Sequence, residues 1–293
     1  MLEEIKIYPG ALGAKLHYRK WSVPSPRGRV VLLHGIESHS GWYLASASFL
    51  AQRGFAVYAP DRRGSGLNLE ARGDTPSYKA LLEDLRIFIE GPPNVSPSEG
   101  QVQPQANEKI GPGIPLHLIG LCWGGKLATA FSLLHPEHIT SLTLITPGLA
   151  SKVDFSGRKK MDIFFSSLFA PRKKFKRPIE KPEMFTANPQ KIEYIKSDGL
   201  RLKDATARFF VESVKLDLFL RQRIHLLKKP IFLLLAGIDP IIDNQKVLSL
   251  VEQIPAEEKK IKVYKNSHHI LEFEEDTQEF LEDLAKWLEA HAP

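Results

Sequence analysis

Residues 116–126 read LHLIGLCWGGK, and this stretch decides the fold. It begins as an apolar run typical of a buried strand, and helical spacing follows it. Between the two lies the pattern Gly-x-Cys-x-Gly, which is typical of a nucleophile elbow with serine as the usual central residue. Gly120 and Gly124 fit that turn because a tight bend leaves no room for side chains two positions before or after its centre. We therefore predict that Cys122 stands at this bend as a nucleophile.

The position of Cys122 also favours a reactive thiol. The N-terminus of the following helix supplies unpaired amides and the positive end of the helix dipole, both of which stabilise a thiolate over a thiol. The alternative is a buried core cysteine, which is what most single cysteines are. The flanking glycines, the preceding strand and the partner residues described below favour the elbow.

The rest of the chain alternates between apolar runs and helical periodicity. Eight strands are expected, at residues 4–7, 15–21, 30–34, 56–60, 116–119, 141–145, 231–235 and 261–264. Helices are expected at residues 42–52, 78–89, 124–134, 245–253 and 277–290. This order is typical of an α/β fold with a mostly parallel eight-stranded sheet and helices on both of its faces.

Two segments interrupt this alternation. Residues 91–113 are rich in proline, glycine and serine, and this composition predicts a flexible surface loop within the core. Residues 148–226, between the sixth and seventh strands, contain helix-like pieces but no strand that could join the sheet. We predict a helical cap at 148–226, inserted into a core formed by residues 1–147 and 227–293.

The composition is that of an ordinary globular chain, with 43% apolar and 25% charged side chains among 293 residues. A single cysteine cannot form an intrachain disulfide, and the N-terminal residues lack the pattern of a secretion signal, so we expect a cytoplasmic protein. No apolar run approaches the roughly 18 residues that cross a bilayer. Residues 151–181 carry ten Lys and Arg against three Asp and Glu, a net +7 within a total of +6, which leaves −1 for the remaining chain. This local excess argues against a nucleic-acid-binding protein.

An elbow nucleophile needs donors for the negative oxygen of its intermediate, and residues 34–43 (HGIESHSGWY) form a suitable loop after the third strand. The backbone amides of Ile36 and Trp123 are the expected donors, because such sites pair an amide of this loop with the residue after the nucleophile. His34 and His39 have no third ligand on the same segment, so a structural role in the loop is favoured over a metal site.

The remaining groups follow the last two strands. Asp239 comes directly after the strand at 231–235 and is the preferred orienting acid. Asp243 is the alternative, although its place suits an N-cap of the next helix. His269, which precedes an apolar pair, is preferred as the base over its neighbour His268. Nucleophile, acid and histidine then follow one another along the chain in the order that an elbow site requires.

Together these motifs resemble the α/β-hydrolase superfamily, and within it the branch of monoacylglycerol lipases, lysophospholipases and carboxylesterases. The resemblance covers nearly the whole chain and rests on HGIESHSGWY at 34–43, PDRRGSG at 60–66, GLCWGG at 120–125, GIDPIID at 237–243 and NSHHIL at 266–271. It implies the same roles for Cys122, Asp239 and His269, and for the amides of Ile36 and Trp123. Cys122 departs from the family's usual serine, and similar cysteine-centred elbows occur in dienelactone hydrolases and polyhydroxyalkanoate synthases. Neither a cofactor nor a metal is expected.

The predicted activity is hydrolysis of lipid-like or other acyl esters through a Cys-His-Asp triad and an acyl-thioester intermediate. Because a thioester also reacts with alcohols, amines and thiols, an acyltransferase or a thioesterase that uses the same cysteine is an alternative. Two further alternatives are an engineered serine-to-cysteine variant of a serine esterase and a non-catalytic binding protein on this fold.

The predicted cap combines aromatic and basic residues. Phe164, Phe165 and Phe169 lie within six residues of one another, and a basic run follows at 171–177. One interpretation is an apolar substrate entry beside a basic rim, suited to an acyl chain with an anionic head group or to an anionic membrane surface contacted through residues 151–181. The other is that the phenylalanines pack the cap onto the sheet and the lysines keep it soluble.

Overall fold

A computed structural model describes residues 3–91, 113–179, 181–275 and 277–292. Its strands are β1 (Glu3–Pro9), β2 (Lys15–Trp21), β3 (Gly28–Leu33), β4 (Phe55–Pro60), β5 (Leu116–Leu121), β6 (Ser141–Ile145), β7 (Lys174–Lys176), β8 (Asp204–Thr206), β9 (Ile231–Ala236) and β10 (Lys259–Tyr264). Its α-helices are α1 (Leu44–Gln52), α2 (Tyr78–Glu90), α3 (Trp123–Leu134), α4 (Gly157–Phe169), α5 (Pro189–Ser197), α6 (Ala207–Arg223), α7 (Asn244–Glu252) and α8 (Gln278–Ala290). Each strand and helix expected from the sequence is present, with its ends shifted by at most two residues.

The eight longer strands form one sheet in the order β1-β2-β4-β3-β5-β6-β9-β10. Strand β2 pairs antiparallel with β1 and with β4, and the other neighbouring strands pair in parallel. Parallel strands end at the same edge of a sheet, so the polar segments that follow β3, β5, β9 and β10 are brought together. The predicted mostly parallel eight-stranded sheet is confirmed.

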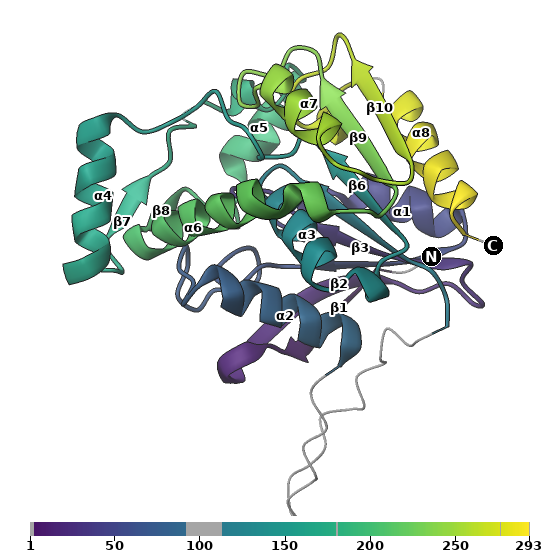
Figure 1. Ribbon diagram of the computed structural model, residues 1–293, viewed down its shortest axis with the longest axis horizontal. Coiled ribbons are helices and arrows are strands. Elements are labelled where there is room, and N and C mark those ends of the chain that lie inside the picture. The colour runs from purple at the N-terminus through teal and green to yellow at the C-terminus, as the bar shows by residue number, and fades with distance from the viewer. Residues whose placement is uncertain (1–2, 92–112, 180, 276, 293) are drawn as a thin grey trace, which may run out of the picture.

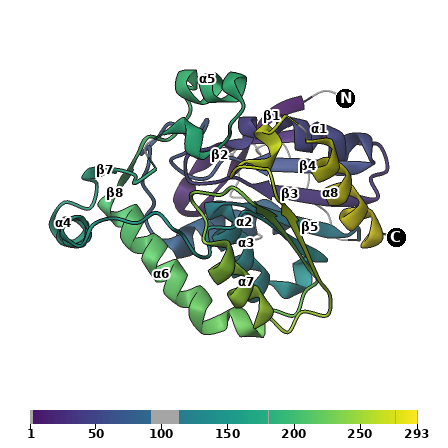
Figure 2. The ribbon, with the colours of Figure 1, turned by 90° about the horizontal axis from the view of Figure 1, so that it is seen from above.

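Helices cover both faces of this sheet (Figure 1). Figure 2 shows α1 and α8 on one face and α2, α3 and α7 on the other. The four strands at the centre, β3, β5, β6 and β9, are buried along their whole length. Their nearly continuous apolar sequences fit strands that are covered on both faces. None of the described helices is long and apolar enough to cross a membrane.

The chain between β6 and β9 folds outside the sheet. It contains α4, α5 and α6, and its two short strands β7 and β8 pair with each other as a separate antiparallel sheet. In both views α4 stands at the outer end of this segment, farthest from the main sheet. The sequence predicted the helices but not the pairing, because strands of three residues are too short to show an alternating pattern. The loop predicted at 91–113 lies almost wholly outside the described residues.

A buried ion-pair cluster ties this segment to the loop after β3. The carboxylate of Glu37 forms an ion pair with the guanidinium of Arg177 through one oxygen, and its other oxygen lies 2.7 Å from Nε of Arg201. Glu37 and Arg177 are only 2% and 5% exposed, so these charges are shielded from water. Paired in this way, they avoid most of the cost of an isolated buried charge. The cluster therefore fixes the segment against a loop that lines the site described below.

A second set of contacts ties α6 to α3. Nε1 of Trp123 donates to Oγ of Ser213 at 2.9 Å, and Nζ of Lys126 lies 2.7 Å from Asp217. Trp123 and Lys126 begin the helix that follows Cys122. The segment is thus anchored directly beside the elbow.

Candidate active site

Cys122 occupies the bend between β5 and α3 in a conformation that residues other than glycine rarely adopt. Its φ is 49° and its ψ is −120°. The flanking glycines are required. A Cβ at Gly120 would lie 2.6 Å from Cα of Gly125, and one at Gly124 would lie 2.2 Å from the carbonyl oxygen of Leu33. The sharp bend that the sequence predicts is therefore present at Cys122.

Backbone hydrogen bonds hold this strained residue. The Cys122 N–H donates to the carbonyl of Ile145 at 3.0 Å. The Cys122 carbonyl accepts from the amides of Gly125 and Gly148, at 3.0 and 2.8 Å. A backbone conformation of this kind costs roughly 1–3 kcal/mol and persists only where the surroundings determine it. Here the surroundings are β6, the first turn of α3 and the loop after β6.

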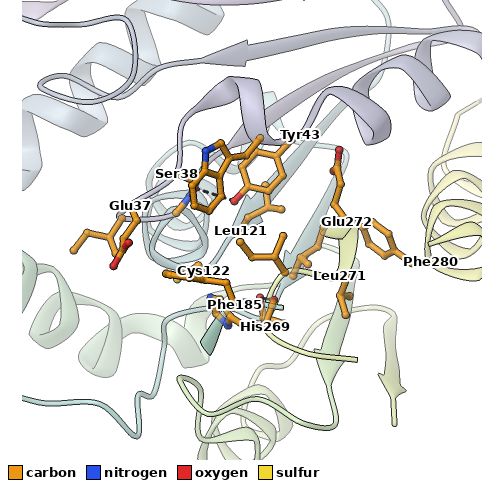
Figure 3. Close-up of a pocket in the computed structure, with 16 residues that line it drawn as sticks. Glu37, Ser38, Tyr43, Leu121, Cys122, Phe185, His269, Leu271, Glu272 and Phe280 are labelled. Carbon is orange, nitrogen blue, oxygen red and sulfur yellow. Dashed lines mark hydrogen bonds between the residues drawn. The ribbon is translucent and has the colours of Figure 1, made fainter. Parts of the chain in front are cut away.

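The sulfur of Cys122 lies at one end of a row of three interacting side chains. It lies next to the ring of His269, as Figure 3 shows, and the two side chains interact electrostatically. Nδ1 of His269 lies 2.9 Å from Oδ2 of Asp239. The other oxygen of Asp239 accepts from the amides of Ile241 and Ile242 at 2.8 and 2.9 Å, which fixes the carboxylate. Because Nδ1 is turned to Asp239, Nε2 is the ring nitrogen that faces the sulfur.

Charge in this chain favours a thiolate opposite an imidazolium. Burial by itself raises the pKa of the Cys122 thiol, but the charge and hydrogen bond of His269, together with the Trp123 amide, lower it below its ordinary value. Burial likewise opposes charge on His269, but Asp239 and the Cys122 sulfur raise its pKa to about 10. The pKa of Asp239 is lowered because His269 and two amides outweigh its burial. These shifts favour a negative sulfur, a positive ring and a negative carboxylate side by side.

Asp243 and His268, the two alternatives, have other partners. Asp243 is the N-cap of α7, where its Oδ1 accepts from the amide of Lys246 at 3.2 Å. Nδ1 of His268 lies 3.2 Å from Oε2 of Glu274. The structure therefore brings Asp239 and His269 to the sulfur, as the sequence favoured, and gives Asp243 the capping place expected for it.

The loop at residues 34–43 runs directly beside the sulfur. A Cβ at Gly35 would lie 3.1 Å from Cβ of Cys122, so the loop backbone passes in contact with the nucleophile. Ile36 and Trp123 stand beside Cys122, because Ile36 lines the same pocket and the amide of Trp123 lowers the pKa of the thiol. Both backbone amides predicted to bind a negative oxygen therefore belong to residues at the sulfur.

The two histidines of this loop are engaged in structural contacts. Nε2 of His34 accepts from the Arg62 amide at 2.9 Å, and Nδ1 pairs with the carbonyl of Gly35 at 2.8 Å. Nδ1 of His39 accepts from the Gly41 amide at 3.1 Å, and Nε2 lies 3.1 Å from Oδ2 of Asp198. All four ring nitrogens thus have partners, which agrees with the structural role that the sequence favoured.

A pocket with about 400 Å³ of empty space, solvent included, lies beside the sulfur (Figure 3). Its walls are largely apolar and come from loops that follow several strands and from the segment between β6 and β9. The apolar side chains that line it are Ile36, Trp42, Tyr43, Leu121, Ile145, Phe185, Ile270, Leu271 and Phe280. Such a pocket suits an apolar group attached to the carbon that the sulfur attacks.

A family model described as serine aminopeptidase, S33, matches residues 24–276. The chain belongs to this family. Among curated relatives, monoacylglycerol lipase of Mycolicibacterium smegmatis is 23% identical over 97% of this chain and 96% of its own length. Human monoglyceride lipase is also 23% identical, over 94% of this chain and 87% of its own length.

Solved structures with a similar fold include two lipases. Monoacylglycerol lipase of Paleococcus ferrophilus superposes with a TM-score of 0.81 at 22% identity, covering 94% of this chain and 99% of that one. A soluble variant of monoglyceride lipase from Saccharomyces cerevisiae, solved with a substrate analog, gives 0.84 at 20% identity and covers 100% and 97%. The predicted α/β-hydrolase fold is confirmed, as is the prediction of a hydrolytic enzyme.

The aromatic residues of α4 lie away from the pocket of this S33 hydrolase. Phe164, Phe165 and Phe169 are 53%, 52% and 84% exposed, and they are not among the residues that line the pocket. Packing of the segment against the sheet therefore does not account for them. The predicted basic rim is not exposed throughout. One of its residues, Arg177, is buried against Glu37.

Sequence reasoning missed two residues of the S33 site. The ring of Phe185 lies 6.0 Å from that of His269, yet it stands in a polar stretch without periodicity. Glu272 lines the pocket and accepts from the amides of Ala45 and Ser46 at 2.8 and 3.1 Å, which caps the N-terminus of α1. Nothing in the local sequence links residues that lie more than 200 positions apart in this way.

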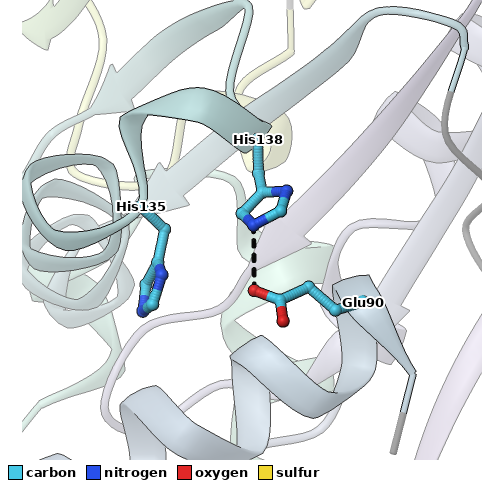
Figure 4. Close-up of side chains that lie close together, drawn as sticks. All are labelled: Glu90, His135 and His138. Carbon is cyan, nitrogen blue, oxygen red and sulfur yellow. Dashed lines mark ion pairs between the residues drawn. The ribbon is translucent and has the colours of Figure 1, made fainter. Parts of the chain in front are cut away.

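A separate cluster of residues that could hold a metal lies at the ends of α2 and α3, where Figure 4 shows Glu90, His135 and His138. One ligand atom from each lies within 4.8 Å of the others. The groups are already paired: Nε2 of His138 lies 2.9 Å from one oxygen of Glu90, and Arg86 binds the other at 2.6 Å. The contacts present thus form an ion-pair network.

Proposed function

We propose that this protein hydrolyses carboxylic esters through a Cys122-His269-Asp239 triad and an acyl-thioester intermediate. At a coarser level it is a lipase- or esterase-type α/β-hydrolase, which its family and its relatives named as lipases support. One observation carries the finer proposal. At a strained elbow, the Cys122 sulfur interacts with the imidazole of His269, whose Nδ1 is hydrogen-bonded to the Asp239 carboxylate.

In the first half-reaction, the Cys122 thiolate attacks the ester carbonyl carbon, and the carbonyl electron pair moves onto its oxygen. The amides of Ile36 and Trp123 bind that negative oxygen. When the intermediate collapses, the carbon–oxygen bond to the alcohol breaks. His269 gives its Nε2 proton to the departing alkoxide, which leaves a thioester on the sulfur and a neutral imidazole.

In the second half-reaction, the neutral ring of His269 takes a proton from water as the water oxygen attacks the thioester. The same amides hold the second negative oxygen. Collapse then breaks the carbon–sulfur bond, releases the carboxylic acid and restores the thiolate–imidazolium pair. Asp239 keeps the ring in the orientation that both steps need and stabilises its charged form.

Residues 148–226 act as a cap over the core of residues 1–147 and 227–293. The cap contributes Phe185 to the pocket wall, and α6 anchors it beside the elbow. Because the walls of the pocket are largely apolar, the acyl group is expected to be a hydrocarbon.

The outer helix of the cap is the part that contacts an anionic membrane surface. One face of α4 exposes Met161, Phe164, Phe165, Leu168 and Phe169, each at least 52% accessible. Exposed cations accompany this face, among them Arg172 with 81% of its side chain accessible. An apolar helix face flanked by cations is suited to the boundary between head groups and acyl chains.

Intact mass spectrometry tests the covalent mechanism directly. We expect activated esters and thioesters of increasing chain length to add one acyl group to the wild-type chain, and the added mass to decay as free acid appears. C122A must take up no acyl group. Wild-type protein that neither gains mass nor releases acid would contradict the proposal and favour a non-catalytic binding protein.

The same assay distinguishes hydrolysis from acyl transfer. Alcohols, amines and thiols are added to the acylated enzyme, and the products are identified. Free acid as the product throughout supports a hydrolase, whereas an acyl group that moves to the added acceptor supports a transferase.

Vesicle sedimentation tests membrane contact. Replacement of Phe164, Phe165 and Phe169 by serine should release the protein from vesicles that contain anionic lipid, and replacement of Arg172 and Lys174 by glutamine should weaken the same binding. Vesicles of neutral lipid serve as the control. Equal sedimentation of all variants would exclude this surface as the contact.

A further inference from the structure

Arg62 is a buried cation that the proposed mechanism has not used. It follows β4 in the stretch PDRRGSG and is 8% exposed. Within the described part of the chain, no carboxylate lies within 4.0 Å of its guanidinium nitrogens. Burial lowers the pKa of Arg62 to about 10, so the side chain keeps its charge at neutral pH. A desolvated cation without an anionic partner is costly, and its surroundings show what it binds instead.

The guanidinium of Arg62 binds the loop that contains the first oxyanion donor. NH1 donates to the carbonyl of Gly35 at 3.1 Å, and NH2 donates to the carbonyl of Ile36 at 3.2 Å. The Gly35 carbonyl also accepts from Nδ1 of His34 at 2.8 Å. This ring must carry its proton on Nδ1, because its Nε2 accepts from the backbone amide of Arg62. Two donors thus fix one carbonyl.

The direction of that carbonyl determines the direction of the Ile36 amide. Both belong to one peptide unit, and the described part of the chain contains no cis peptide bond. In a trans peptide the C=O and N–H point in opposite directions. With the Gly35 oxygen held toward Arg62, the Ile36 N–H faces away from the guanidinium, and no described group hydrogen-bonds to it.

Arg62 also contacts the residue that supplies the second donor. Its guanidinium carbon lies 4.8 Å from the centre of the Trp123 ring and 5.4 Å from that of Phe209 on α6. Aromatic faces attract a cation, and the attraction is strongest where water is excluded. One side chain is therefore in contact with both segments that hold the oxyanion donors.

We propose that Arg62 is the positioning residue of the oxyanion hole, where it orients the Ile36 amide toward the developing negative oxygen and places a fixed positive charge behind it. The inference rests on the proposed function, because it requires an oxyanion to form at Cys122. It assigns no contact between Arg62 and substrate. A positive charge fixed in a water-excluded site stabilises a developing anion without reorganising during the reaction.

The test compares R62Q and R62K with R63Q. Arg63 is a suitable control because it is the neighbouring arginine, and its partners are the Asp84 carboxylate and the Ala11 carbonyl. Three rates or affinities are measured on each protein: acylation by an activated ester, binding of an alkyl trifluoromethyl ketone, and alkylation by iodoacetamide. The first two form a negative oxygen beside the sulfur, whereas alkylation needs only the thiolate.

We expect R62Q to lose about 100-fold in acylation and a similar factor in ketone binding, the size of effect found when one oxyanion donor is removed. Its alkylation rate should stay within about threefold of that of R63Q. R62K keeps the charge but cannot bridge two carbonyls, so it should lie between R62Q and wild type in both oxyanion measurements. If R62Q does not fold, R62K decides the question by the same comparison.

Two results would overturn the inference. In one, the Arg62 variants match R63Q in acylation and ketone binding. In the other, alkylation falls as far as acylation, which would mean that Arg62 acts on the thiolate or on the fold. A wild-type protein that is alkylated but never acylated would instead contradict the proposed function itself.

Discussion

The proposed reactivity of the Cys122 sulfur depends on partners that lie far away in the sequence. His269 comes from the loop after β10 and Asp239 from the loop after β9, and both reach the elbow because parallel strands end at the same edge. The lowered pKa of the thiol favours a thiolate before substrate arrives, whereas a serine at the same place would have to lose its proton during attack. Single substitutions of the nucleophile and of the candidate acids test these roles.

Replacement of Cys122 separates the nucleophile from the scaffold that serves it. C122A should abolish ester hydrolysis. C122S should retain activity, because the elbow and the His269–Asp239 pair are those that a serine needs. Iodoacetamide should inactivate the wild-type protein and leave C122S unaffected. Persistent activity in C122A, measured with the same esters, would show that another residue carries the reaction.

The two candidate acids, Asp239 and Asp243, predict different effects of substitution on kcat and on stability. D239N should lower kcat by as much as about 10⁴-fold, because an amide no longer stabilises the charged imidazole or its orientation. D243N should leave kcat unchanged and lower only stability, because it removes the N-cap of α7. Steady-state kinetics and urea unfolding of both variants check this. The reverse pattern would assign the acid to Asp243.

The residues of the site differ in how far the sequence could predict them. Cys122 and its glycines lie within one short motif, and the preferred acid and base follow strands that periodicity locates. Arg62 and Glu272 carry no such signal. Arg62 contributes through carbonyls of Gly35 and Ile36, and Glu272 caps α1 from the other end of the chain. Contacts of that kind depend on tertiary packing, which local pattern does not encode.

At the scale of elements, the proposed cap is attached by a few ion pairs and hydrogen bonds. The Glu37–Arg177–Arg201 cluster joins it to the loop that also carries Ile36, and α6 joins it to α3 through Ser213. The sequence predicted helical pieces in this segment, but it did not predict the contacts that attach them to the core. Arg177 illustrates the reason, since within the sequence it is one of many neighbouring cations.

Loss of Arg177 should weaken this attachment. R177M leaves a buried carboxylate with one partner fewer, so the free energy of unfolding should fall by about 3–5 kcal/mol. R172M is the matched control from the same basic run, because its side chain is 81% exposed and surface changes of this kind have small effects. Urea unfolding measures both. Equal stability of the two variants would mean that the cluster does not hold the cap.

At the scale of the whole molecule, the α/β alternation made the sheet predictable. Central strands covered on both faces must be apolar throughout, and β3, β5, β6 and β9 are. Amphipathic helices must then cover those faces. The two strands of the cap escaped prediction because they are short and are stabilised by each other.

One buried acid should make global stability depend on pH. Burial raises the pKa of Glu272 to about 7, although three hydrogen bonds from Ala45 and Ser46 oppose the shift. A carboxyl whose folded pKa is raised stabilises the fold below its unfolded pKa, and that stabilisation is lost as pH rises through the folded value. E272Q should therefore gain stability relative to wild type between about pH 4.5 and 7, by on the order of 3 kcal/mol at most.

Urea unfolding of E272Q and wild type across this pH range measures the difference between their free energies of unfolding. The contributions of all other carboxyls cancel in this difference. A difference that stays flat with pH would show that Glu272 titrates in its ordinary range and that the hydrogen bonds outweigh the burial.

The chain contains one cysteine, and it stands partly exposed at the pocket. A maleimide fluorophore or a fluorine-bearing tag is therefore expected to attach only at this residue, without removal of other thiols by mutagenesis. The spectrum of such a tag would report on the surroundings of the pocket, including movement of Phe185 and the cap above it. The chain thus offers a single labelling site for spectroscopy at the place where chemistry is proposed to occur.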